Sequence, residues 1–280
     1  MKFIWLKMVL SLAYLFIVLS LKAQDDTVLH AKDSVIEAES QDCYVRFFDH
    51  AIKISSPSKI ILITKDKKTT SLSKFIKTND LRETALYSLA DLDHDGKNEL
   101  VIRNYTGGAH CCDEFYFFKG IGPDKYQYAA KTFAGNSCIN DQDEITYNFY
   151  EQFGYFFTCY ACTYEDSSEA APGEVPDLVL KYSKGRLVII PGDKELQNMI
   201  NDNLGKLSER PYQKLDNDAD QDDGVRKEFA LNLATFHYSF GKNINETKKL
   251  FDRYYKFPDA KKVWTEFIKI LNGVKQENDF

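Results

Sequence analysis

Short runs of β-branched and aromatic residues, broken by glycine, proline, aspartate or asparagine, constrain the fold of this chain more than any other feature. Runs of this length and composition, closely spaced along a chain, are typical of strands joined by tight turns. We expect strands at residues 44–54, 59–65, 84–90, 99–105, 114–119, 125–133, 144–150, 154–162, 177–183 and 186–192. The spacing predicts an antiparallel β-meander, either propeller-blade-like or sandwich-like.

The apolar period changes after Pro191. Phe229, Leu233 and Phe236 recur at the spacing of one helix face, and the other runs in this part follow the same period. We expect helices at residues 193–207, 224–242, 244–257 and 259–273. The predicted fold class is therefore α+β, a β-meander followed by a C-terminal module of three to four helices.

The first residues have the features of a secretory signal peptide. Lys2 and Lys7 precede an uncharged run, residues 8–21, and the small residue Ala23 offers a cleavage point. The run is shorter than the roughly 20 residues of a membrane-spanning helix, although an uncleaved N-terminal anchor is the alternative. We therefore predict a periplasmic or extracellular protein without stable membrane insertion after cleavage.

The charge of the remaining chain excludes one class of partner. Removing residues 1–23 takes away three lysines and no acid, so the formal charge changes from −6 to −9. An acidic chain lacks the basic footprint of a nucleic-acid-binding protein. We divide the chain into a signal peptide (1–23), a β-rich domain (24–192), a helix with an acidic linker (193–221) and a helical module (222–280).

The stretch "DLDHDGKNEL" has the pattern of a calcium loop. Asp91, Asp93 and Asp95 occupy alternate positions, and Gly96 permits the tight turn that brings their oxygens together. Glu99 adds a fourth acid. Four acids so close in sequence repel one another unless a cation neutralises them, which favours an ion over a solvated acidic turn.

The flanks of this loop separate it from an EF-hand. An EF-hand requires a bidentate acid at position 12, where this chain has Ile102, and both flanks have the pattern of strands. The backbone carbonyl of Lys97 is a further candidate ligand at position 7. The sequence therefore predicts a structural calcium site in a β-hairpin.

Residues 86–103 resemble the FG-GAP/VCBS-type repeat, which carries a D-x-D-x-D-G-x-x-D/E loop followed by a strand. The adjacent "YTGGAHCC", residues 105–112, is similar to a segment that accompanies this loop in secreted bacterial proteins. The resemblance implies that Asp91, Asp93, Asp95, the Lys97 carbonyl and Glu99 hold a structural Ca²⁺. His94 departs from the family pattern, which often has glycine there, and one loop does not make a multi-bladed propeller.

A second acidic run precedes the helices. Asp216, Asp218, Asp220, Asp222 and Asp223 are followed by Gly224, which falls one residue late for a calcium loop. Because helix N-termini favour negative charge, we interpret the run as a solvated linker that ends at a helix start rather than a second ion site.

The even number of cysteines in an exported chain predicts disulfides. The candidates are Cys43, Cys111, Cys112, Cys138, Cys159 and Cys162. If both close pairs are extended, their side chains alternate between faces, so one bridge on each face can join them. Cys43 then pairs with Cys138. A redox-active C-x-x-C at Cys159 and Cys162, and a zinc site that includes His110, are the alternatives.

No catalytic residues and no organic cofactor are predicted. The chain has no G-x-S-x-G, no H-E-x-x-H and no phosphate-binding glycine loop. We predict a binding or interaction protein of the cell envelope, whose partner is a protein or a glycan. The alternative is an enzyme, either a periplasmic thiol-disulfide oxidoreductase or a hydrolase.

Overall fold

The computed structural model describes residues 86–106, 113–122, 125–134, 137–140, 142–162, 174–215 and 222–280, together with short strands nearer the N-terminus. The predicted signal peptide lies outside the described residues. In the part of the chain that is described, no helix combines the length and the apolar character that crossing a membrane requires.

The N-terminal strands form two small antiparallel units. They are β1 (Thr27–His30), β2 (Val35–Glu37), β3 (Tyr44–Arg46), β4 (Ala51–Ile54), β5 (Ile60–Ile63) and β6 (Thr69–Ser71). One sheet has the order β1-β4-β5-β6, and β2 pairs with β3 separately. The single strand predicted at residues 44–54 is therefore wrong, because its two halves belong to different sheets.

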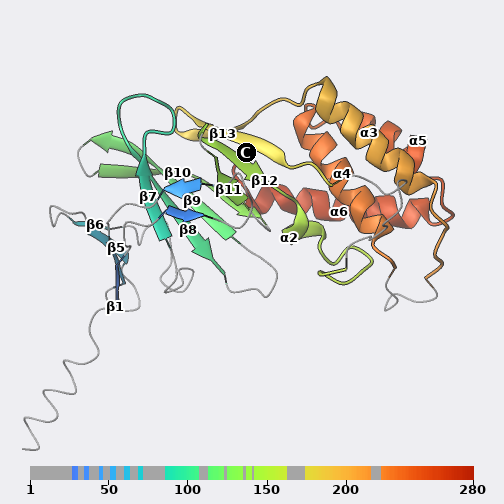
Figure 1. Cartoon of the computed structure of the whole chain (residues 1–280), viewed down its shortest axis with the longest axis horizontal. Coiled ribbons are helices and arrows are strands. Elements are labelled where there is room, and N and C mark those ends of the chain that lie inside the picture. The colour runs from blue at the N-terminus through green and yellow to red at the C-terminus, as the bar shows by residue number, and fades with distance from the viewer. Residues whose placement is uncertain are drawn as a thin grey trace, which may run out of the picture.

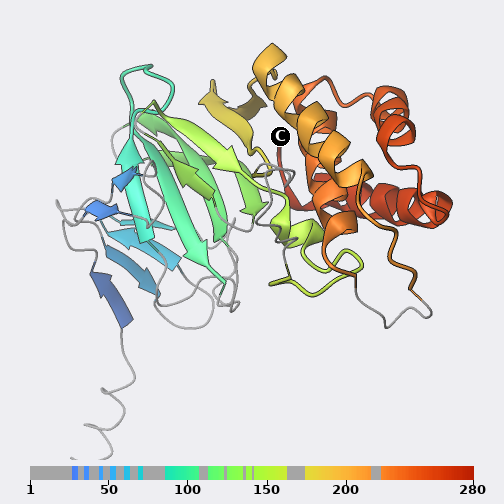
Figure 2. The same ribbon diagram turned by 45° about the vertical axis from the view of Figure 1, so that its right-hand side comes forward.

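A four-stranded meander occupies the centre of the β-rich part (Figure 2). Its strands are β7 (Leu86–Ala90), β8 (Glu99–Tyr105), β9 (Asp113–Gly122) and β10 (Lys125–Ala134), each paired with the next. The register pairs Ala90 with Glu99, so the ends of the acidic loop lie directly opposite each other. The first four residues of β8 are buried, because apolar groups cover both faces of the strand.

A second antiparallel sheet has the order β11-β12-β13-β14. Its strands are β11 (Ser137–Ile139), β12 (Glu144–Tyr147), β13 (Leu178–Ser183) and β14 (Arg186–Ile189). Lys184 and Gly185 connect the last two strands with φ angles of 52° and 79°. These left-handed conformations are those of the two-residue turn that matches the twist of a hairpin.

The strand predicted at residues 154–162 is wrong. The short helix α2 (Tyr150–Phe153) precedes this stretch, which forms a series of turns that include Phe157, whose φ is 57°. Phe153 and Phe156 are buried side by side in an edge-to-face contact instead of alternating across a sheet. A short aromatic run fits a buried loop as well as a strand, so periodicity alone does not separate the two.

Four longer helices form the C-terminal module, at the right of Figure 1. They are α3 (Lys194–Ser208), α4 (Val225–Ser239), α5 (Ile244–Tyr254) and α6 (Ala260–Glu277). Asp193 caps α3 by accepting a 2.8 Å hydrogen bond from the Leu196 N–H. All residues of α4 are buried, because the other elements surround this helix. The α+β fold class, with antiparallel sheets followed by helices, is confirmed.

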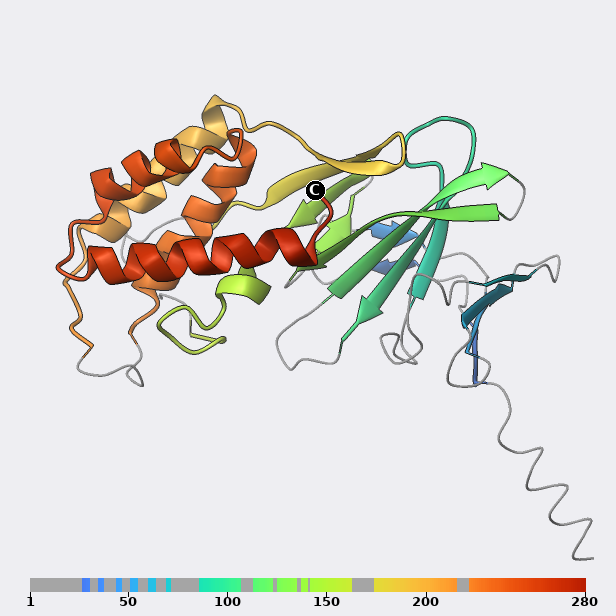
Figure 3. The ribbon, with the colours of Figure 1, turned by 180° about the vertical axis from the view of Figure 1, so that it is seen from behind.

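The hydrophobic core continues across the predicted domain boundary. A single cluster of buried side chains includes Phe117 and Tyr182 from the sheets and Phe229 and Phe267 from the helices. The end of α6 also reaches the meander (Figure 3), where the Asp279 N–H donates a 3.0 Å hydrogen bond to the Lys131 carbonyl. The helices, the β7–β10 meander and the β11–β14 sheet therefore share one packed interior.

Candidate metal site

The β7–β8 loop is built around Asp91. Its Oδ1 accepts a hydrogen bond from the Asp95 N–H and its Oδ2 accepts one from the Gly96 N–H, both at 2.9 Å. His94 and Gly96 adopt left-handed φ angles of 56° and 85°, which let the chain wrap around this carboxylate. The left-handed conformation at residue 94 explains why glycine is common there in the loops that this one resembles, and histidine tolerates it.

Three of the predicted ligands come together in this loop. Asp91, Asp93 and Glu99 each offer a carboxylate oxygen, and these oxygens lie within 4.8 Å of one another. Asp95 lies outside this group, since its Oδ1 accepts from the Lys97 N–H at 3.0 Å and its Oδ2 lies 3.7 Å from Lys97 Nζ. The roles of Asp95 and of the Lys97 carbonyl stay predictions.

Glu99 is the buried member of the group. Its side chain is fully buried, and Oε2 accepts a 3.0 Å hydrogen bond from the Leu92 N–H, whereas no hydrogen bond reaches Oε1. Burial raises the pKa of this carboxyl to about 7. The backbone N–H groups of Leu92 and Gly120 oppose the rise, that of Gly120 from beyond normal hydrogen-bond geometry, and the charges of Asp93 and Asp95 add to it. A buried carboxylate oxygen without a partner is costly, and a cation is the partner that fits it.

Asp93 connects the loop to the second sheet. Its Oδ2 accepts a 2.8 Å hydrogen bond from the Lys184 N–H at the tip of the β13–β14 hairpin, and its Oδ1 is buried without a partner. Figures 1 and 3 both show this hairpin tip meeting the loop. Tyr182, on β13, has a buried hydroxyl without a partner, and burial followed by the charge of Glu99 raises its pKa. Sequence spacing gave no indication of Tyr182 or Lys184.

Close backbone packing holds the last part of the loop in place. A Cβ atom at Gly120 would lie 2.3 Å from the Asn98 carbonyl oxygen, so β9 passes the loop where only glycine fits. On the other side, His94 Nε2 lies 3.4 Å from an Asp143 carboxylate oxygen in the β11–β12 turn. The loop therefore contacts two turns of the second sheet as well as its own meander.

The donor set fits a hard cation. At an effective dielectric constant of 20, two unit charges at the 4.8 Å limit of these oxygen separations repel each other by about 3.5 kcal/mol, and three carboxylates share this site. Oxygen ligands without nitrogen or sulfur suit Ca²⁺ or Mg²⁺ rather than zinc. This group of Asp91, Asp93 and Glu99 could hold a metal ion.

The cysteines are paired differently from the prediction. Cys159 and Cys162 form a disulfide with each other. The predicted bridges from these residues to Cys111 and Cys112 are wrong, because the chain turns at residues 159–162 instead of extending. Cys43, Cys111, Cys112 and His110 lie outside the described residues; of Cys138 only the backbone, in β11, is described. The Cys43–Cys138 pairing stays a prediction.

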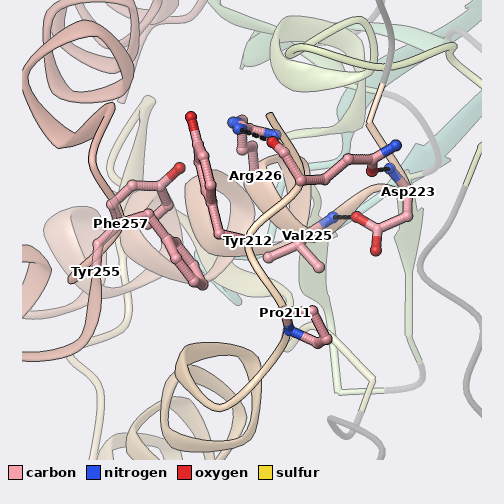
Figure 4. A pocket seen from close by; sticks show the side chains of 8 residues that line it. Pro211, Tyr212, Asp223, Val225, Arg226, Tyr255 and Phe257 are labelled. Atoms are coloured by element: carbon pink, nitrogen blue, oxygen red, sulfur yellow. Dashed lines mark hydrogen bonds between the residues drawn. The ribbon is translucent and has the colours of Figure 1, made fainter. Parts of the chain in front are cut away.

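A small pocket lies at the start of α4 (Figure 4). The guanidinium of Arg226 stacks 5.6 Å from the Tyr212 ring centroid and forms ion pairs at 2.8 Å with both Asp222 and Asp259. Asp222 is buried and accepts hydrogen bonds from the N–H groups of Gly224, the N-cap residue, and of Arg226 in the first turn of α4. Asp222 therefore lies at a helix start, as the sequence predicts, but it is buried rather than solvated, and residues 216–221 lie outside the described part. Because Arg226 is paired on both sides, the pocket offers a ligand little charge.

No protein-family model matches the chain, and no curated protein or solved structure matches it either. The resemblance to the FG-GAP/VCBS-type repeat therefore rests on residues 86–103 and the adjacent "YTGGAHCC" alone.

Proposed function

We propose that this chain is an exported Ca²⁺-binding protein, in which the ion fixes the β7–β8 loop against the second sheet so that the β-rich part can bind a protein or glycan at the cell envelope. The observation that carries the proposal is Glu99 Oε1, a fully buried carboxylate oxygen without a partner beside the Asp91 and Asp93 carboxylates. An ion there would replace the missing hydrogen bonds of Glu99 and of Asp93 Oδ1 at once.

Calcium fits this loop better than magnesium. Ca²⁺ accepts irregular sets of six to eight oxygens that include carbonyls and water, whereas Mg²⁺ requires a near-ideal octahedron. The three carboxylates are irregularly spaced along the loop. Asp93 and Glu99 also each accept a backbone hydrogen bond. A flexible coordination sphere suits such ligands.

Calorimetric titration of the chelator-stripped protein tests the ion. We expect one Ca²⁺ per chain with a Kd of roughly 0.1–1 mM, the range of extracellular modules, and weaker binding of Mg²⁺. Glu99→Gln should remove the binding heat, and Asp252→Asn, a matched change at an exposed acid of α5, should leave it intact. Absence of saturable Ca²⁺ binding by the wild-type protein would refute the proposal.

A calcium-dependent pull-down tests the interaction role. Immobilised protein is incubated with envelope extract in calcium or in a chelator, beside immobilised Glu99→Gln. A partner retained by the wild-type protein in calcium, but not in chelator or by the variant, supports the proposal. A partner retained equally in all three conditions shows that the ion does not prepare the binding surface.

A further inference from the structure

The Cys159–Cys162 bridge closes a short turn that other contacts already hold in place. The Cys162 N–H donates a 3.2 Å hydrogen bond to the Cys159 carbonyl. Just before the turn, Thr158 Oγ1 donates a 2.9 Å bond to the Asp222 carbonyl, and the Asp222 N–H donates one of 2.9 Å to the Phe157 carbonyl. A bridge between residues so close in sequence restricts the unfolded chain much less than one that closes a long loop. Its contribution as a structural link is therefore small.

A buried cation faces this turn. Lys227, on α4, is fully buried, and its Nζ donates hydrogen bonds of 3.2 Å to the Cys159 carbonyl and 3.0 Å to the Tyr160 carbonyl. In the described part of the chain, no carboxylate oxygen lies within the 4.0 Å of an ion pair with this ammonium. Burial lowers the Lys227 pKa, while the charges of Glu228 and Asp222 oppose the shift.

Reduction of the bridge would place a negative charge near Lys227, which forms no ion pair in the described part of the chain. A cysteine beside a cation has a lowered pKa, so a thiolate released there is stabilised and leaves readily in an exchange reaction. The ammonium bonds to the carbonyl of Cys159 itself, which favours this residue as the leaving thiolate. The sulfur that a substrate attacks is then that of Cys162.

The surface beside the bridge is accessible and aromatic. Ala161 is exposed and both cysteines are partly exposed, so a substrate thiolate can approach. Tyr155 is 75% exposed and its ring centroid lies 5.4 Å from that of Tyr160, between the cysteines. The exposed Tyr155 ring beside the partly buried Tyr160 suits contact with the side chains of an extended polypeptide.

We propose that Cys159 and Cys162 form a thiol–disulfide exchange site that oxidises a pair of cysteine thiols in an exported polypeptide, with Lys227 positioned to stabilise the leaving thiolate. A substrate thiolate attacks Cys162 Sγ, the S–S bond breaks, and its electron pair goes to Cys159 Sγ, on the residue whose carbonyl accepts a hydrogen bond from Lys227. The second substrate thiolate then attacks the substrate sulfur of the mixed disulfide and releases Cys162. The substrate gains a disulfide, and the two cysteines take up the two protons that the substrate thiols released.

A peptide with a single cysteine reports the first step in the unmodified protein. Oxidised protein is mixed with the peptide, remaining thiols are blocked with iodoacetamide, and the products are mapped by mass spectrometry. We expect the peptide on Cys162 and the label on Cys159, at a rate about tenfold or more above that of the isolated CYAC tetrapeptide disulfide. A rate equal to that of the tetrapeptide, or a peptide attached to Cys159 instead, would overturn the assignment.

The pH dependence of alkylation of the reduced protein tests Lys227. We expect the Cys159 thiolate to form at least about one pH unit below the usual ~8.5 and to return toward that value in Lys227→Met. Lys194→Met, at an exposed position of α3, is the matched control and should leave the profile unchanged. If Lys227→Met does not fold, the alkylation profile of the wild-type protein alone tests the role of Lys227. A midpoint for Cys159 alkylation at or above pH ~8.5 would exclude stabilisation of its thiolate by the ammonium.

Discussion

The backbone N–H of Lys184 donates a 2.8 Å hydrogen bond to Asp93 Oδ2 across a sequence separation of 91 residues. One carboxylate therefore belongs both to the acidic loop and to the contact with the β13–β14 hairpin. An ion bound to Asp93 Oδ1 would stabilise this contact between two sheets, and its effect should extend beyond the loop itself.

Calcium should raise the melting temperature of the protein. With a Kd near 0.1 mM and calcium near 2 mM, binding to the native state alone adds about 1.8 kcal/mol to the free energy of unfolding. For a protein of this size the midpoint rises by roughly 4 to 7 °C, which differential scanning measures. Asp93→Asn and Glu99→Gln should each remove most of the rise, while Asp252→Asn should retain it.

Asp95→Asn tests whether Asp95 binds the ion, as the sequence pattern predicts, or lies outside the site, as in the structure. The alternating pattern makes Asp95 a ligand, but its carboxylate bonds to Lys97 and lies outside the group of three. The geometry predicts that Asp95→Asn keeps most of the calcium-dependent rise in the same scan, since asparagine can still accept the Lys97 N–H bond. A loss as large as that in Glu99→Gln would show that Asp95 moves onto the ion.

The two left-handed residues of the loop should respond differently to substitution. Gly96 has a φ of 85° and open space around its Cα, so Gly96→Ala should lower the free energy of unfolding by about 1 kcal/mol through backbone strain alone. His94→Gly should change it by less than about 0.5 kcal/mol, because relief of the strain offsets the greater entropy of the unfolded glycine chain. Urea denaturation of the chelated proteins measures both values. Equal losses in the two variants would contradict this account.

The loop was predictable because its acids are close in sequence. Asp91, Asp93 and Glu99 lie within nine residues, and the spacing between two strand patterns carries enough information to bring them together. Tyr182 and Lys184 reach the site only through the packing of the second sheet on the first. No local period encodes that approach, so they could be found only in the folded structure.

The region around the bridge departs from the predicted strand for a different physical reason. Aromatic residues at 154–162 have strand propensity, but the left-handed Phe157 and the contact of Gly154 with the Tyr160 ring require turns. The acids before α4 likewise have the composition of a linker, whereas Arg226 from the helix draws Asp222 into the interior. In both places tertiary contacts override the local preference.

His237 should make the protein sensitive to acid. It is buried on α4, its Nδ1 lies 3.0 Å from Thr247 Oγ1, and burial with the charges of Lys275 and Lys242 lowers its pKa to about 4 from 6.5. Between these values the unfolded chain binds a proton that the native state does not, so stability falls as the pH falls from 6.5 to 4. The full loss is about 3 kcal/mol.

The variant His237→Asn isolates the contribution of His237 to the pH dependence of stability from that of other buried acids and bases. Glu228, whose pKa burial raises to about 7, acts in the opposite sense, because its native state loses stability as the pH rises from 4.5 to 7. Subtracting the urea-derived stability of His237→Asn from that of the wild type at each pH cancels this contribution. The difference should shrink by up to about 3 kcal/mol between pH 7.5 and pH 4. If the stability difference between the wild type and His237→Asn is the same at every pH, groups other than His237 cause the acid sensitivity.

The C-terminal residues should stabilise the sheets as well as the helices. The Asn278 side chain accepts a 2.7 Å bond from the Phe133 N–H, and Phe280 makes edge contacts with the Tyr147 and Tyr238 rings at 5.0 and 5.5 Å. Phe280→Ala should lower the free energy of unfolding by about 2 kcal/mol, since the ring is partly buried. Gln276→Ala, at an exposed position, is the matched control and should stay within about 0.5 kcal/mol of the wild type.

Two probes show whether this loss is shared across the molecule. Trp264, which packs against Phe251 and Phe267, reports the helices by fluorescence, and amide hydrogen exchange in β10 reports the meander. Because the core is continuous, we expect Phe280→Ala to lower the Trp264 unfolding midpoint in urea and to speed exchange at the Phe133 amide. If the fluorescence midpoint falls while exchange in β10 stays unchanged, the helices unfold independently, and the C-terminal contact does not couple them to the sheet.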